Sequence, residues 1–196
     1  MKRLTRITSK IVLLNSQQLN TIFKNSTEHL RLVMELAVNT GVRLNELRSL
    51  KFSDFDLKNS ILHVAVENSK TKKHDRFIPL NYKAKAAVKM LKKDRKETDY
   101  ITDLTDHAFK THCYRLSHKI GFRFSFHSLR HTLITAFYNA SLDPYMTASV
   151  SGHKSINTTM IYVHQSGTAA KSVVDRMNFD FDLKTPFDFS RIKRTC

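Results

Sequence analysis

Cysteine, proline and glycine are all scarce in this 196-residue sequence, which has two, three and four of them respectively. Two cysteines, one of which is the terminal Cys196, do not build a disulfide framework, so a reduced, cytoplasmic protein is expected. The shortage of glycine and proline excludes long flexible linkers and low-complexity segments. The longest apolar patch, residues 11–14, is far shorter than the roughly 18 apolar residues that span a membrane, so no membrane partner is expected.

Acidic residues are few as well. The sequence has 17 Asp and Glu against 33 Lys and Arg, which gives a net charge of +16 and a pI near 10.0. An excess this large favours a polyanionic partner, nucleic acid first, over a basic surface that is merely solvated. Hydrophobic residues make up 41% of the chain and aromatic residues 10%, which indicates a globular domain with its own core.

Capping residues indicate where several helices begin and end. Ser16 is the expected N-cap of the first helix, and Thr27 begins the second. Gly41 is well placed as the residue that follows the second helix. Asp143 followed by Pro144 is typical of an N-cap and a first helical position.

Hydrophobic periodicity predicts an α+β protein that is mainly helical, with one small antiparallel β-sheet. The predicted strands cover residues 61–66 and 76–80, and a lysine-rich hairpin loop at 67–75 joins them. The predicted helices cover residues 16–23, 27–40, 44–50, 81–93, 105–118, 126–139, 143–152 and 158–164. We expect a basic lead-in at 1–14, one domain at 15–165 and a phenylalanine-bearing tail at 166–196.

Two candidate functional positions lie in the first half of the chain. Arg43 follows the turn glycine at a predicted helix N-terminus, where a guanidinium can bind a phosphate, and Glu46 comes three residues later. Taken alone, Arg43 is equally an ordinary surface arginine. Lys70 lies in the lysine-rich turn, which is usually only solvated but can deliver an ammonium to a nucleic-acid backbone.

Two more candidate positions lie in the second half. His127 and Arg130 are three residues apart on one predicted helix and therefore share a face. A zinc site at His127 and His131 is rejected, because the residue after the first histidine is Ser128 where that motif needs glutamate. His153 and Tyr162 come next, although a lone histidine or tyrosine is most often a core residue.

Together these residue types suit one kind of chemistry. Two arginines, a lysine and two histidines can stabilise a negatively charged phosphoryl transition state, and a tyrosine can hold the phosphoryl group covalently. The sequence has no evident acidic metal-binding constellation and no glycine-rich phosphate loop. Side chains are therefore expected to neutralise the charge, without a metal or other cofactor.

Four segments, in this order, resemble the catalytic domain of the tyrosine recombinases, the phage integrase family. They are TGVRLNELRSL, SKTKKHDRFIPL, HSLRH and SGHKSINTTMIYVH. Residues 15–165 would then be the catalytic domain. The resemblance implies catalytic roles for Arg43, Lys70, His127, Arg130, His153 and Tyr162, and a supporting role for Glu46.

By this resemblance Arg43 and Arg130 would clamp the phosphate, and His153 would hydrogen-bond a non-bridging oxygen. Tyr162 would be the nucleophile that forms a 3′-phosphotyrosine link to DNA. His127 would assist proton transfer at the attacking and leaving oxygens.

The hairpin lysine of the family protonates the leaving 5′ oxygen, and Lys70 is preferred for this role over Lys72 and Lys73 in the same turn. Tyr145 precedes His153 in the sequence, whereas the family nucleophile follows that position, so Tyr145 is not expected to react.

The implied partners are double-stranded DNA, further copies of this chain and accessory DNA-bending proteins. The chain would form a tetramer on DNA and be a monomer in solution. The implied place of action is the nucleoid of a bacterial host. The tail at 166–196 would pack on a neighbouring protomer, pack in cis or be disordered. Two other functions stay open: a regulator that binds DNA without catalysis, and a relaxing enzyme with type IB topoisomerase chemistry. Little sequence precedes the catalytic segments, so the chain is either a fragment or resembles the minimal invertase-type recombinases.

Overall fold

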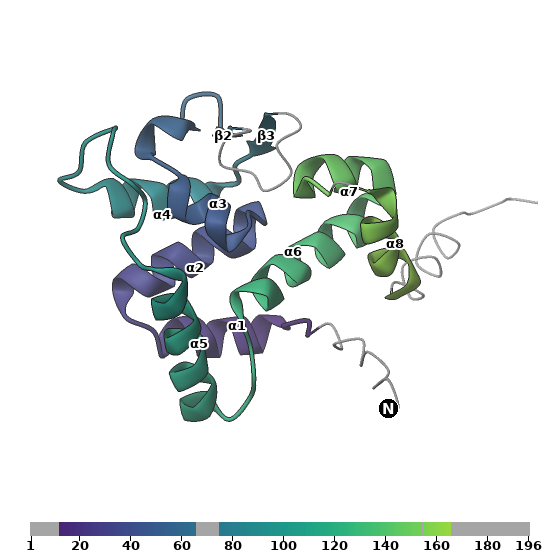
Figure 1. Ribbon diagram of the computed structural model, residues 1–196, viewed down its shortest axis with the longest axis horizontal. Coiled ribbons are helices and arrows are strands. Elements are labelled where there is room, and N and C mark those ends of the chain that lie inside the picture. Colours follow the sequence, from purple (N-terminus) through teal and green to yellow (C-terminus); the bar gives the residue numbers. More distant parts are fainter. Residues whose placement is uncertain (1–11, 66–74, 154, 166–196) are drawn as a thin grey trace, which may run out of the picture. The chain divides into compact units, whose positions relative to one another are not determined.

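The computed structural model describes residues 12–65, 75–153 and 155–165, and these residues form a mainly helical α+β fold (Figure 1). This is the predicted fold class. Its helices are α1 (Ser16–Lys24), α2 (Glu28–Thr40), α3 (Leu44–Ser49), α4 (Tyr82–Lys92), α5 (Asp106–Ile120), α6 (Phe126–Ser141), α7 (Pro144–Ser151) and α8 (Ile156–Gln165), with a 3-10 turn at Phe52–Asp54. Its strands are β1 (Phe55–Asp56), β2 (Ile61–Val64) and β3 (Arg76–Pro79).

The helix ends follow the capping residues, with one correction. The N-cap of α1 is Asn15 and not Ser16, because Asn15 and Gln18 exchange hydrogen bonds in a capping box that Ser16 has no partner to make. Thr27 precedes α2, and Gly41 follows it in the left-handed conformation (φ 65°), as predicted. The Asp143 carboxylate accepts hydrogen bonds from the first turn of α7.

The strands form a three-stranded antiparallel sheet in the order β1-β2-β3. Strands β2 and β3 are each a little shorter than predicted, and most of the loop between them lies outside the described residues. Side chains alternate across a strand, and in β3 this alternation buries Arg76 and Ile78 on the face that Leu62 and Val64 cover from β2. An arginine therefore points from a strand into the interior.

The main core is built around α2, which packs on α4 and α6. Figure 1 shows α6 leading from the region of α1 and α5 to α7 and α8. A second, smaller apolar cluster of Ile134, Tyr138 and Tyr162, bordered by Leu142, lies between α6 and α8. The active-site candidates therefore come from elements that the two clusters hold together. Within the described residues no helix has the length and apolarity to cross a membrane.

Candidate active site

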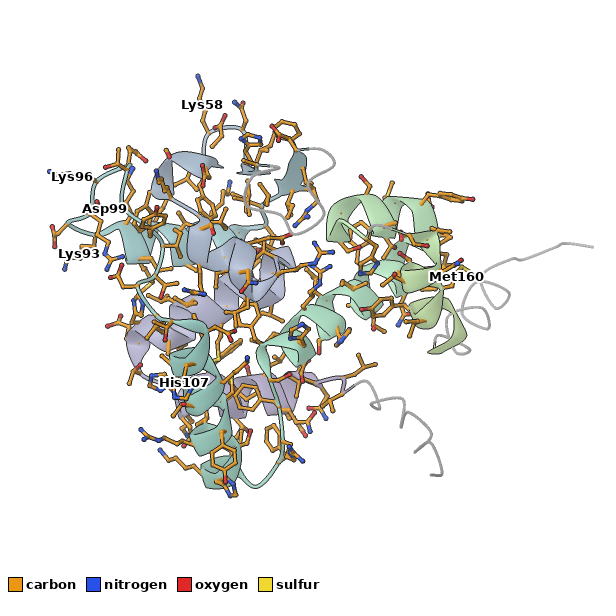
Figure 2. All side chains as sticks on the ribbon, in the orientation of Figure 1. Lys58, Lys93, Lys96, Asp99, His107 and Met160 are labelled. Atoms are coloured by element: carbon orange, nitrogen blue, oxygen red, sulfur yellow. The ribbon has the colours of Figure 1, made fainter. Side chains whose placement is uncertain are left out.

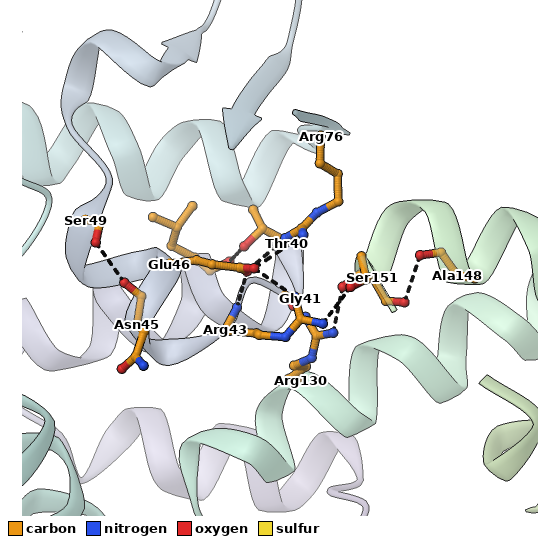
Figure 3. A network of polar contacts seen from close by, with 12 residues as sticks. Thr40, Gly41, Arg43, Asn45, Glu46, Ser49, Arg76, Arg130, Ala148 and Ser151 are labelled. Carbon is orange, nitrogen blue, oxygen red and sulfur yellow. Dashed lines mark hydrogen bonds and ion pairs between the residues drawn. The ribbon is translucent and has the colours of Figure 1, made fainter. Parts of the chain in front are cut away.

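Arg43 is placed by the local sequence at the start of α3. Glu46, at the third helical position, accepts a hydrogen bond from the Arg43 backbone N–H (2.7 Å) and pairs with Arg43 Nη1 (2.8 Å). A carboxylate in the first turn also faces the positive end of the helix dipole. The Arg-x-x-Glu spacing thus fixes both the helix end and the direction of the guanidinium (Figure 3).

Glu46 is almost completely buried, at 1% exposure, and binds a second arginine. Arg76 Nη2 lies 2.8 Å from Glu46 Oε2, so one carboxylate pairs with two guanidinium groups (Figure 3). Burial alone would raise the pKa of Glu46, but hydrogen bonds and charge from Arg76, and then from Arg43, lower it to about 2. Glu46 is therefore ionised at neutral pH and serves as the shared anchor of the two arginines.

We predict that Glu46 makes the free energy of unfolding depend on pH in the acid range. Its pKa falls from an ordinary 4.5 to about 2, so its stabilising effect is complete above pH 4.5 and is lost as the pH falls towards 2. A shift of this size corresponds to about 3 kcal/mol in the free energy of unfolding. Urea unfolding of wild type and Glu46→Gln at pH 7, 4 and 2.5 measures it.

Glu46→Gln should be less stable at pH 7, because two buried guanidinium groups lose their counter-charge. The stability gap between the two proteins should narrow steadily below pH 4.5. A gap that stays constant down to pH 2.5 would contradict the assignment. Glu35→Gln is the matched control, because Glu35 also pairs with an arginine, Arg31, in a partly exposed helical pair.

Arg130 extends from α6 toward the same region and is buried, at 5% exposure. Its guanidinium donates to the carbonyl oxygens of Gly41 and Ser151 (Nη2 to Ser151 O, 2.7 Å). Burial, followed by the charge of Arg43, lowers the pKa of Arg130 to about 10, so it is still a cation at neutral pH. Arg43, Arg76 and Arg130 thus bring three cations near a single buried carboxylate, and the excess positive charge favours an anion.

Gly152 brings the turn between α7 and α8 against these arginines. Its carbonyl oxygen accepts a hydrogen bond from Arg43 Nη2 (2.6 Å), and its φ is 65°. A Cβ atom at this position would overlap the Arg76 guanidinium and come within 2.9 Å of its Cζ. Glycine is needed here both for the backbone conformation and for the close approach of Arg76.

Gly152→Ala should therefore destabilise the fold by more than the about 1–2 kcal/mol that a left-handed alanine costs. Arg76 is held by Glu46 and cannot move away freely, so its displacement adds to the backbone cost. The matched control is Gly121→Ala, because Gly121 also has a positive φ (80°) but nothing lies within 4 Å of its Cβ position. Thermal unfolding measures both, and equal losses in the two variants would contradict the close packing of Arg76.

His153 follows this turn and is oriented by α8. Its Nδ1 lies 2.8 Å from Thr159 Oγ1, and its ring stacks on that of Tyr162 (5.9 Å between centroids, 8° between planes). Burial, with the charges of Arg130 and Arg43, lowers the pKa of His153 to about 3. The imidazole is neutral, and when Nδ1 accepts the Thr159 hydroxyl its proton lies on Nε2, where it can be donated to an anion.

Tyr162 is buried, at 2% exposure, and its hydroxyl contacts a histidine that the sequence reasoning did not assign to the site. The Tyr162 Oη lies 2.6 Å from His131 Nδ1, and the two ring centroids are 5.8 Å apart. Burial raises the pKa of Tyr162, whereas the charges of Arg130 and Arg43 oppose that rise. Both arginines are therefore close enough to Tyr162 for their charges to affect its phenol.

His127 lies one turn before His131 on α6 and faces solvent, with its ring centroid 6.3 Å from that of His131. Partial burial and the charges of Arg130 and Arg43 lower its pKa. It therefore lies at the edge of the arginine cluster, toward the open cavity described below, rather than against Tyr162.

The structure brings five of the seven sequence-predicted residues into one connected group, and His127 lies at its edge. The connected ones are Arg43, Glu46, Arg130, His153 and Tyr162. Lys70, like Lys72 and Lys73, lies outside the described residues, so its placement stays a prediction. Tyr145 is 75% exposed on α7.

The sequence reasoning missed two members of the group, Arg76 and His131. Arg76 could have been found from its inward position in an alternating strand, and His131 from its place one helical turn after His127.

Comparison with known proteins agrees with the fold and shows the family of the chain. Residues 13–168 match the family described as "Phage integrase family", and the chain belongs to that family. It is 31% identical over 134 residues to the tyrosine recombinase XerA of Saccharolobus solfataricus, a match that covers 68% of this chain and 45% of that protein. It is 27% identical over 150 residues to a shufflon-specific DNA recombinase of Escherichia coli, covering 76% of this chain and 38% of that one. The chain thus spans less than half the length of these relatives.

Solved structures show the same fold. A Tn1549 transposon integrase in complex with transposon right end DNA superposes with a TM-score of 0.75 at 21% identity, over 88% of this chain and 68% of that one. The catalytic domain of bacteriophage HP1 integrase superposes with a TM-score of 0.65 at 19% identity, over 91% of this chain and 100% of that one. The predicted recombinase catalytic fold is confirmed.

Proposed function

We propose that this chain is the catalytic part of a site-specific DNA recombinase that cleaves and rejoins DNA through a 3′-phosphotyrosine link on Tyr162. The observation that carries the proposal is that Tyr162, from α8, shares one site with Arg43, Arg130 and His153 of the same chain. Family membership supports it, as do the recombinase names of the relatives and the DNA in the complex of the Tn1549 integrase.

The site suits the charge that develops when a phosphodiester is attacked. The phosphorane-like transition state carries extra negative charge on its non-bridging oxygens, and pre-placed cations stabilise that charge without reorganising. Arg43 and Arg130 would hold those oxygens, and His153 would donate a further hydrogen bond. Glu46 and Arg76 fix the direction of Arg43 and the position of the 152 turn, and do not themselves touch DNA.

Backbone carbonyl groups accept hydrogen bonds from both arginines. Arg130 donates to Gly41 and Ser151, and Arg43 donates to Gly152. A phosphate is a stronger acceptor than a carbonyl for a guanidinium, so DNA would replace these bonds and move the turn that carries Ser151 and Gly152. That movement would also uncover the buried Tyr162, which must reach phosphorus to react.

A cavity of about 1060 Å³ opens beside Arg43 and His127 and would receive the DNA. Its walls come from the N-terminus of α3, from α5 and from residues 121–127, and they carry Lys110, Arg123 and the exposed Tyr114. Cations and an exposed ring next to the arginine site suit a phosphate backbone and base edges.

Further lysines of the described part lie elsewhere on the surface. Figure 2 shows Lys58, Lys93 and Lys96 directed outward at the margin of the molecule, and all three are exposed. These exposed charges would attract DNA without contacting the reacting phosphate, and dissolved salt would screen the attraction.

A covalent-trapping assay tests the proposal. The chain is mixed, in EDTA, with duplexes that are nicked just 3′ of a randomised segment, so that cleavage releases a short 5′-hydroxyl fragment and religation fails. A denaturing gel should show a DNA–protein adduct, and sequencing the trapped strand gives the preferred site. An adduct formed without divalent metal supports recombinase chemistry, whereas specific DNA binding without an adduct favours the regulator. Relaxation of supercoiled DNA by the monomer, with no exchange between paired sites, would favour the topoisomerase alternative.

The recombining assembly would be a tetramer of such chains on two DNA sites, to which accessory DNA-bending proteins could be added. Analytical ultracentrifugation of the chain, alone and with the site recovered above, measures this directly. A monomer alone and a four-chain complex with DNA are expected.

A further inference from the structure

His131 contacts the hydroxyl group of Tyr162, and neither the resemblance nor the comparisons assigns it a role. Its Nδ1 lies 2.6 Å from Tyr162 Oη, within ordinary hydrogen-bond length. The bond joins α6 to α8, since His131 and Tyr162 are 31 residues apart in the sequence. Tyr162 belongs to the small apolar cluster between α6 and α8, and His131 is half-buried beside it, whereas His127 is exposed.

The protonation state of His131 suits it to accept a proton. Burial, with the charges of His127 and Arg130, lowers the pKa of His131, so its imidazole is neutral near pH 7. In a neutral imidazole one ring nitrogen is an acceptor, and Nδ1 is the nitrogen that faces the phenol. Burial raises the pKa of Tyr162, so its phenol keeps its proton at neutral pH. The phenol therefore needs a base when its oxygen attacks phosphorus.

The other two histidines of the site are worse placed for this step. His153 stacks on the ring of Tyr162, and its Nδ1 is already bonded to the Thr159 hydroxyl rather than to the phenol. His127 has its ring against His131, with the centroids 6.3 Å apart, and faces the cavity. His131 is thus the histidine of the described residues whose nitrogen meets the Tyr162 hydroxyl.

We propose that His131 is the general base that takes the phenolic proton of Tyr162 during DNA cleavage, an inference that rests on the function proposed above. The O–H bond of Tyr162 breaks toward His131 Nδ1, and its electron pair forms the bond from Oη to phosphorus. The bond from phosphorus to the 5′ oxygen breaks, and that oxygen takes a proton from the hairpin lysine. During rejoining the His131 imidazolium returns its proton to Oη.

The charged groups around His131 account for when this transfer occurs. Arg130 and His127 on α6 disfavour an imidazolium, and Arg43 acts on the phenol of Tyr162 while His153 stacks on its ring. A DNA phosphate bound to Arg43 and Arg130 adds negative charge to the site. Protonation of His131 then becomes less costly, so substrate binding itself prepares the base.

The test compares three proteins in the covalent-trapping assay: wild type, His131→Asn and His131→Ala. Asparagine keeps a hydrogen-bond acceptor for the Tyr162 hydroxyl but cannot take its proton. If His131 is the base, both variants should lose about 100-fold or more in the rate of adduct formation. The wild-type rate should also fall at acid pH as His131 is protonated, and this limb should be absent from the His131→Asn profile.

A substrate with sulfur in place of the bridging 5′ oxygen separates the base from the acid. Sulfur is a good leaving group without protonation, so this substrate should rescue Lys70→Ala but leave the His131→Asn defect in place. His29→Gln is the matched control, because His29 is a half-buried histidine bonded to Thr102 on a remote part of α2. Its rate should equal that of wild type.

The outcomes distinguish the two proposals. Wild-type rates in His131→Asn, or rescue of that variant by the sulfur substrate, would overturn the role of His131 while Tyr162 remains the nucleophile. If wild type forms no adduct although it binds DNA, the proposed function fails and the role of His131 fails with it. Circular dichroism and thermal unfolding of each variant establish that a slow variant is folded.

Discussion

Replacing Tyr162 with phenylalanine should abolish covalent DNA adducts. Without the phenolic oxygen, residue 162 cannot form a covalent bond to the phosphoryl group of the DNA. The rate of adduct formation should therefore fall by more than about 10³-fold, as it does when other enzymes lose their nucleophile. DNA binding should change little, because the arginines, the lysines and the cavity walls are unaltered. Adduct formation on nicked duplexes and a gel-shift assay measure the two properties side by side.

The structure supplies a matched control for this variant in Tyr145→Phe. Tyr145 lies on α7, one helix away, and is 75% exposed, so losing its hydroxyl should leave both properties unchanged. Tyr162→Phe also removes the hydrogen bond to His131, which should cost about 1 kcal/mol in the free energy of unfolding and leave the protein folded. Adducts that persist in Tyr162→Phe and vanish in Tyr145→Phe would place the nucleophile on α7.

Local signals in the sequence predicted much of the fold and part of the site. Gly41 and the Asp143-Pro144 pair mark helix ends through rules that need only a few neighbouring residues. Arg43 and Glu46 are similar, because a three-residue spacing at a helix start brings the two side chains together. Asn15 was missed because two good capping residues are adjacent, and the glutamine three residues after Asn15 decides between them.

The missed site residues depend on packing between distant segments. Arg76 lies 30 residues from Glu46 along the chain and meets it only because β3 turns its inward side toward α3. His131 was visible as a helical neighbour of His127, but its partner Tyr162 is set by the packing of α8 on α6. The periodicity of a sequence predicts which side of a helix or strand is buried. It does not predict which other element packs against that side, because this depends on how the apolar side chains of distant segments pack together.

Arg130→Ala should slow DNA cleavage by about 10³-fold or more, a loss typical of a cation that stabilises phosphoryl transfer. The Arg130 side chain is 5% exposed, so water screens its charge less than it screens a charge at the surface. DNA affinity should fall far less than the rate, because Lys110, Arg123 and the exposed lysines would still attract the DNA backbone. Single-turnover cleavage rates and equilibrium binding on the same duplex separate the two effects.

Stability must be followed together with rate, because Arg130 also ties the carbonyl groups of Gly41 and Ser151 across three elements. Arg48→Ala is the matched control: Arg48 donates to the Leu104 carbonyl away from the site, so its loss should lower stability without slowing cleavage at saturating DNA.

Arg130→Lys keeps the charge but cannot bridge two acceptors in the plane of a guanidinium, so its rate should lie between those of wild type and Arg130→Ala. If Arg130→Ala slowed cleavage only as much as Arg48→Ala does, Arg130 would be a structural tie between α6 and the 152 turn rather than a phosphate clamp. Arg43, with the hydrogen bond from His153, would then hold the phosphate.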